Sequence, residues 1–103
     1  MRELVIPYTT SEYIKVPLTA WSGTVADPTT LTVELAVITP GAVPQSGDWK
    51  TATWVTESSV IKARALWSTL VPSAAPSTTY GTWMRITASP EQPVIYSGPI
   101  KTL

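Results

Sequence analysis

The feature that most constrains the fold of this chain is a strict alternation of apolar and polar side chains. The clearest case is residues 31–38, where one face is wholly apolar and consists of Leu31, Val33, Leu35 and Val37. Successive side chains of a strand point to opposite faces of a sheet, so this pattern predicts a strand with one face in a hydrophobic core. Apolar residues show no clear helical spacing anywhere in the chain.

The same alternation recurs along the chain between turn signals supplied by ten prolines and five glycines. We expect strands at residues 3–8, 12–19, 31–38, 49–56, 60–67, 79–87 and 94–102, with a bulge at Gly98 and Pro99 in the last one. About seven strands at intervals of roughly 8–15 residues predict a single antiparallel β-sandwich of the immunoglobulin or fibronectin type III class. It would occupy residues 1–103 as one domain. Parallel pairing is not expected, because no helical crossover segment is present.

A more specific local pattern is a proline-containing turn that leads into a strand beginning with Tyr80. It resembles the tyrosine corner that precedes the sixth strand of such sandwiches. There the ring packs on the edge of the core and the hydroxyl bonds to the backbone of the preceding loop. Alternation directs Tyr80, Met84 and Ile86 into the core. The simpler alternative is a strand that merely starts with a tyrosine.

The other face of this strand carries Trp83 and Arg85, which are predicted to point outward. A fully exposed tryptophan offers up to ~200 Å² of mostly apolar surface, which at ~25 cal/mol/Å² is worth several kcal/mol when a partner covers it. Trp and Arg are also enriched at interface hot spots. We therefore expect Trp83 and Arg85 to bind a partner. The alternative is an internal stack of Arg85 on Trp83.

Three further residues are candidates for partner binding. The chain has five tryptophans and no phenylalanine, and Trp49 and Trp54 fall on opposite faces of an extended strand, so they cannot both lie in the core. Either can belong to a protein interface or to a sugar-stacking platform. Glu91 lies in a turn stiffened by two prolines, where it can face a partner or Arg85. The simpler interpretation of Glu91 is a solvated surface carboxylate.

The composition argues against catalysis and against anionic partners. The chain contains no cysteine and no histidine, so disulfides, thiolate sites and histidine bases are absent. The carboxylates follow no metal-binding motif, and we expect no catalytic residue, cofactor or metal. A formal net charge of zero gives no reason to approach nucleic acid or a membrane surface. Neither a secretory signal nor a membrane-spanning run of about 20 apolar residues is recognisable in the sequence.

The C-terminal third, residues 80–100, reads Tyr-Gly-Thr-Trp-Met-Arg-Ile-Thr-Ala-Ser-Pro-Glu-Gln-Pro-Val-Ile-Tyr-Ser-Gly-Pro-Ile. It resembles small proteins encoded by tailed phages of actinobacteria, which share Tyr-x-x-Trp-x-Arg-Ile-Thr-x-x-Pro-Glu-x-Pro-Val. The segments at residues 49–54 and 63–65 look similar as well, so the resemblance covers about half of the chain. It implies an immunoglobulin-like virion structural protein that assembles in the host cytoplasm and brings no catalytic residues.

These observations favour a non-enzymatic structural protein of a phage virion. We expect a capsid decoration protein or a small head or tail accessory subunit that binds viral structural proteins in many symmetric copies. The alternative is a carbohydrate-binding or adhesion module that contacts host surface glycans through surface tryptophans. A third hypothesis is a fibronectin-like module detached from a larger bacterial machine.

Overall fold

The structure, a computed structural model, describes residues 4–18, 27–88 and 92–103. Its strands are β1 (Leu4–Ile6), β2 (Tyr13–Pro17), β3 (Thr32–Ile38), β4 (Lys50–Glu57), β5 (Val60–Leu66), β6 (Thr79–Thr87) and β7 (Val94–Thr102). Its helices are the short η1 (Pro28–Thr30), η2 (Ser46–Asp48) and α1 (Trp67–Leu70). The expectation of an all-β fold with about seven strands is confirmed.

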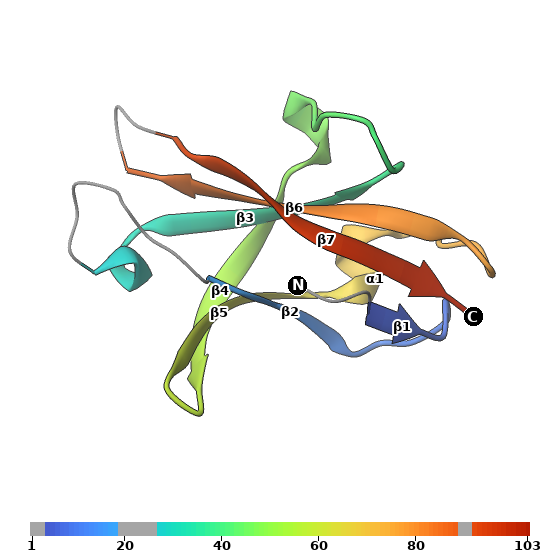
Figure 1. The fold of residues 1–103 in the computed structure, drawn as a ribbon, viewed down its shortest axis with the longest axis horizontal. Coiled ribbons are helices and arrows are strands. Elements are labelled where there is room, and N and C mark those ends of the chain that lie inside the picture. Colours follow the sequence, from blue (N-terminus) through green and yellow to red (C-terminus); the bar gives the residue numbers. More distant parts are fainter. Residues whose placement is uncertain (1–3, 19–26, 89–91) are drawn as a thin grey trace.

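The strands form one curled, half-barrel sheet in the order β1-β7-β6-β3-β4-β5-β2. Strand β4 belongs to both parts of this sheet, because residues 50–52 pair with β3 and residues 53–57 pair with β5. In Figure 1, β3, β6 and β7 lie across the view, whereas β4 runs steeply downward from them to the hairpin that joins it to β5. The sheet therefore bends at β4 and wraps its apolar faces around one core.

One strand pair corrects the prediction of a purely antiparallel arrangement. Strand β1 pairs with β7 in parallel, with Leu4 opposite Ile100 and Ile6 opposite Thr102. Parallel neighbours need a long connection, which is usually a local crossover helix. Here β1 and β7 come from opposite ends of the chain, so all the intervening strands serve as that connection. Residue patterning indicates only local crossovers, so this parallel pair was not predicted.

The core lies where the alternation predicted it. Among the residues expected to face inward, the structure buries Val33, Leu35, Val37, Met84 and Ile86. The other two, Leu31 and Tyr80, are half-buried and pack against this cluster. Burying one such side chain is worth about 1.5–3 kcal/mol, so the two facing rows of β3 and β6 supply much of the stability.

Trp67 departs from its predicted place at the end of the fifth strand. It begins α1 instead, where it is only 1% exposed, and its indole Nε1 donates to the backbone oxygen of Tyr8 at 3.2 Å. Its ring also meets Tyr80 edge-on at 5.6 Å. The helical turn moves the bulky ring under the loop that joins β1 to β2, and Pro72 restricts the helix to a single turn.

The predicted irregularity in the last strand is confirmed. Gly98 has a φ of 121° and stands opposite Thr82, whereas Tyr96 stands opposite Trp83, so Ser97 is an extra residue in β7. Such a bulge re-aims the side chains that follow or precede it. Its consequence here is that Tyr96 and Trp83 become cross-strand partners on the outer face of the sheet.

Candidate interaction surface

Five side chains gather on the outer face of the β3–β6–β7 part of the sheet. We call this surface the aromatic face, and it consists of Glu34, Trp49, Trp83, Arg85 and Tyr96. The register places Glu34 beside Arg85 and Trp83 beside Tyr96. The structure thus brings together three of the predicted partner-binding residues, Trp49, Trp83 and Arg85, and adds two that the sequence did not single out.

Arg85 is held in place by two neighbours. Its Nε and Nη2 both donate to Oε1 of Glu34, at 3.0 and 2.8 Å, and both side chains are half-buried. Its guanidinium carbon lies 4.6 Å from the centroid of the Trp49 ring. The alternative of a stack on Trp83 is therefore replaced by a stack on Trp49. The carboxylate of Glu34 on β3 holds the guanidinium of Arg85 over β3, so the guanidinium lies away from Trp83 on its own strand.

Trp83 and Tyr96 form the second pair of the aromatic face. Their ring centroids are 5.1 Å apart at an interplanar angle of 65°, an edge-to-face arrangement. Tyr96 is 53% exposed, whereas Trp83 is half-buried. A Cβ atom on Gly81 would come within 3.4 Å of Cε1 of Tyr96, so this glycine leaves room for the ring. Tyr96 is thus the more exposed of the two rings.

Sequence reasoning missed Tyr96, although the alternation in residues 94–102 contained a usable signal. Val94 and Tyr96 are two residues apart on one face, and both are exposed. The sequence does not link Glu34 to Arg85, because alternation alone does not give the register of β3 against β6.

Two other predicted residues do not join this surface. Trp54 lies on the opposite side of β4 from the aromatic face, packs against the core and donates from Nε1 to the backbone oxygen of Leu31 at 2.8 Å. The structure therefore places Trp54 at the edge of the core. As predicted, Trp49 and Trp54 do not both lie in the core. Glu91 lies outside the described residues.

The loop before β6 is fixed by hydroxyl groups. The Tyr80 hydroxyl accepts a hydrogen bond from the backbone N–H of Ala75 at 3.1 Å, which confirms the predicted bond to the preceding loop. The Thr102 hydroxyl donates to the oxygen of Ala75 at 2.6 Å and accepts from the N–H of Thr78 at 2.9 Å. Both backbone groups of Ala75 are therefore tied to strands that border the core.

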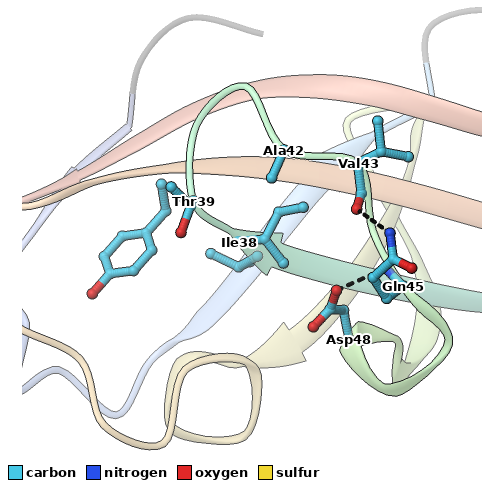
Figure 2. A pocket seen from close by; sticks show the side chains of 8 residues that line it. Ile38, Thr39, Ala42, Val43, Gln45 and Asp48 are labelled. Atoms are coloured by element: carbon cyan, nitrogen blue, oxygen red, sulfur yellow. Dashed lines mark hydrogen bonds between the residues drawn. The ribbon is translucent and has the colours of Figure 1, made fainter.

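A hollow of about 550 Å³ lies beside the long loop between β3 and β4. It is lined by Val37, Ile38, Thr39, Ala42, Val43, Gln45, Asp48 and Tyr80. Figure 2 shows that two of its polar side chains, Gln45 and Asp48, form hydrogen bonds within the loop itself. The Asp48 carboxylate accepts from the N–H of Gln45 at 2.7 Å, and the Gln45 amide donates to the oxygen of Val43 at 3.1 Å. These polar groups shape the loop and are already engaged.

Carboxylates with shifted pKa values lie away from the aromatic face. Hydrogen bonds from the Thr29 side chain and backbone lower the pKa of Asp27, which caps η1. Hydrogen bonds from Lys15 and Lys62 lower the pKa of Glu57. Among the described residues, no three His, Cys, Asp or Glu side chains are grouped so that they would hold a metal. No helix in the described part of the chain has the length and apolarity to cross a membrane.

Comparison with known proteins adds no assignment: no family model, curated protein or solved structure gives a significant match to the chain.

Proposed function

We propose that this chain is a non-enzymatic virion structural protein of a tailed phage, a capsid decoration protein or a small head or tail accessory subunit. In this proposal it docks on other viral proteins through the aromatic face. The observation that carries the proposal is the arrangement of two preformed side-chain pairs on one exposed sheet face, Arg85 on Trp49 and Trp83 on Tyr96.

The physical argument concerns the cost of binding. Each rotamer-rich side chain that becomes fixed in an interface costs about 0.5–1.5 kcal/mol. Here Arg85 is already fixed by Glu34 and Trp49, and Trp83 is already packed against Tyr96. The charge of Arg85 is also neutralised before any partner arrives. A partner that binds this surface would contact residue types common at hot spots, and fewer side chains would lose conformational entropy on binding.

We also propose that the sheet is a sandwich of the immunoglobulin type. Support comes from β4, which divides its pairing between β3 and β5 and so separates the strands into two parts. Further support comes from the Tyr80 hydroxyl bond to the preceding loop.

The link to a virion rests on the resemblance of residues 80–100 to small phage proteins. In this proposal, the residues of that pattern divide between a structural and a binding role. In Tyr-x-x-Trp-x-Arg, Tyr80 ties down the preceding loop, while Trp83 and Arg85 stand on the aromatic face. A pattern that combines a structural anchor with two surface anchors suits a small subunit that repeats over a particle.

Glycan binding is the second candidate function, and the exposed ring of Tyr96 favours it. Stacking of a sugar requires a free, flat ring face. Arg85 covers one face of Trp49, and Trp83 meets Tyr96 edge-on, so the face offers less free ring surface than the count of aromatic residues suggests. Tryptophan fluorescence titrated with a panel of oligosaccharides tests this candidate, and a flat response across the panel eliminates it.

The main proposal is tested on particles of the phage that encodes the chain. The protein is expected to sediment with purified virions, and Tyr96→Ala is expected to weaken its attachment about 30-fold, the effect of a hot spot of about 2 kcal/mol. Tyr8→Ala is the matched control, because Tyr8 is a 40% exposed tyrosine away from the aromatic face. The proposal fails when the chain is found only in the particle-free lysate, or when both variants attach equally well.

A further inference from the structure

The second surface of interest is the free edge of β2, which is the last strand in the sheet order and has no strand beyond it among the described residues. The oxygen of Glu12 accepts from the N–H of Trp67 at 3.0 Å, and the N–H of Leu18 donates to the oxygen of Ile61 at 2.9 Å. Backbone groups of alternate residues point to the same side of a strand. The even-numbered residues of β2 therefore bond to β5, and Tyr13 and Lys15 direct their N–H and C=O groups away from it.

Side chains beside this edge carry an excess of positive charge. Lys15, Lys62 and Arg64 lie on the outer face of β2 and β5, because the residues between them, such as Val16 and Ala63, are buried. Lys15 and Lys62 share the carboxylate of Glu57 at the end of β4, which accepts from Lys15 at 2.7 Å and from Lys62 at 3.3 Å. Within the described part of the chain, this face holds three cations and one carboxylate, in a chain whose formal net charge is zero.

Arg64 is the cation that this carboxylate does not neutralise. Its guanidinium carbon lies 4.6 Å from the centroid of the Tyr13 ring, so the side chain leans from β5 toward the β2 edge. Among the described residues no carboxylate pairs with it, and its buried Nε has no hydrogen-bond partner. Tyr13 beneath it is 46% exposed. Arg64 thus contrasts with Arg85, whose charge is satisfied by Glu34.

We propose that the free edge of β2 binds an extended, acidic segment of a partner protein as an eighth strand. The outward N–H and C=O groups of Tyr13 and Lys15 would pair with the backbone of the segment. Carboxylates on its outer face would meet Lys15 directly across the new strand pair and Arg64 beside it. This inference rests on the β2 edge alone and does not depend on the virion assignment or on the aromatic face.

Charge decides between this occupant and two others. A second copy of the chain, paired antiparallel about Lys15, would bring two Lys15 side chains together, and Pro17 would offer no N–H. Nucleic acid affinity comes from many phosphate contacts, and a neutral chain with a three-cation face supplies few. An acidic strand satisfies both the unpaired backbone groups and the excess charge.

The test uses a short fluorescent peptide in which Glu alternates with Val and Thr, with fluorescence anisotropy and amide chemical shifts as readouts. Binding is expected to shift the Tyr13 and Lys15 amide signals and to weaken as salt rises. Lys15→Pro removes both the ammonium group of Lys15 and an N–H that points away from β5, so the β2–β5 hydrogen bonds are kept while binding weakens about tenfold. Arg64→Gln is expected to weaken binding as well. Lys101→Gln, an exposed lysine on β7, is the matched control and should leave affinity unchanged.

The alternatives are distinguished in the same assay. The proposal is overturned when the acidic peptide does not bind, when a peptide with Lys in place of Glu binds equally well, or when Lys15→Pro binds like the unaltered protein. Displacement of the peptide by oligothymidylate at equal concentration would reassign the surface to nucleic acid. None of these outcomes bears on attachment through Tyr96, so the two proposals stand or fall separately.

Discussion

Two buried threonines provide a sharp test of the hydrogen-bond reasoning, because the same substitution is expected to have opposite effects at the two sites. Thr82 and Thr102 are both 0% exposed. The hydroxyl of Thr102 donates to the oxygen of Ala75 at 2.6 Å and accepts from the N–H of Thr78 at 2.9 Å. The hydroxyl of Thr82 has no hydrogen-bond partner in the described part of the chain. Thr→Val keeps the size of the side chain and removes only the hydroxyl.

The expected magnitudes follow from what each substitution leaves behind. Thr102→Val removes the partner of two part-buried backbone groups, the oxygen of Ala75 and the N–H of Thr78, at about 1 kcal/mol each. The resulting loss of about 2 kcal/mol should lower Tm by roughly 8–16 °C in a domain of this size. Thr82→Val removes a hydroxyl whose desolvation is uncompensated. The gain of about 1 kcal/mol should raise Tm by roughly 4–8 °C.

Thermal unfolding by circular dichroism, together with urea unfolding of the same variants, measures both effects. The urea m-value should stay constant, since neither change alters the surface exposed on unfolding. The reasoning is refuted when the two variants shift Tm in the same direction. If Thr82→Val lowers Tm, the Thr82 hydroxyl has a hydrogen-bond partner, for example an internal water.

Three further outcomes are expected. Hydrogen bonds from Lys15 and Lys62 lower the pKa of Glu57 below its ordinary value of 4.5. The ionised Glu57 therefore stabilises the fold above pH 4.5, and this contribution is lost as the pH falls through the lowered pKa. Glu57→Gln should therefore flatten the acid side of a urea-stability profile, and an unchanged profile would contradict this. Arg85→Met should cost about 1–2 kcal/mol in thermal unfolding because it leaves the half-buried Glu34 unpaired, a loss that an additional Glu34→Met should largely reverse. Trp67→Phe should lose about 2–4 kcal/mol, since it removes the bond to the loop between β1 and β2 and leaves a cavity, and a neutral result would place the indole outside the core.

Much of the candidate surface was within reach of sequence reasoning. The alternation in residues 79–87 correctly separated Met84 and Ile86, which are buried, from Trp83 and Arg85, which are not. It could not supply their partners. Glu34 was missed because it is 51 residues away from Arg85 in the chain, and period-two patterning carries no information about which strands are neighbours.

Alternation and turn chemistry by themselves determined the number of strands, their approximate ends and, for residues 31–38 and 79–87, the face that is buried. These properties are local, since the two sides of a strand are fixed by backbone geometry within a few residues. Only the tertiary structure decided that β1 joins β7 in parallel, that β4 divides between two neighbours and that Trp67 turns into a helix. It also decided that Arg85 rests on Trp49 while Arg64 leans toward the β2 edge. These features depend on contacts between segments that are far apart in the sequence. Such contacts form only when the whole core is packed, so local patterning does not reveal them.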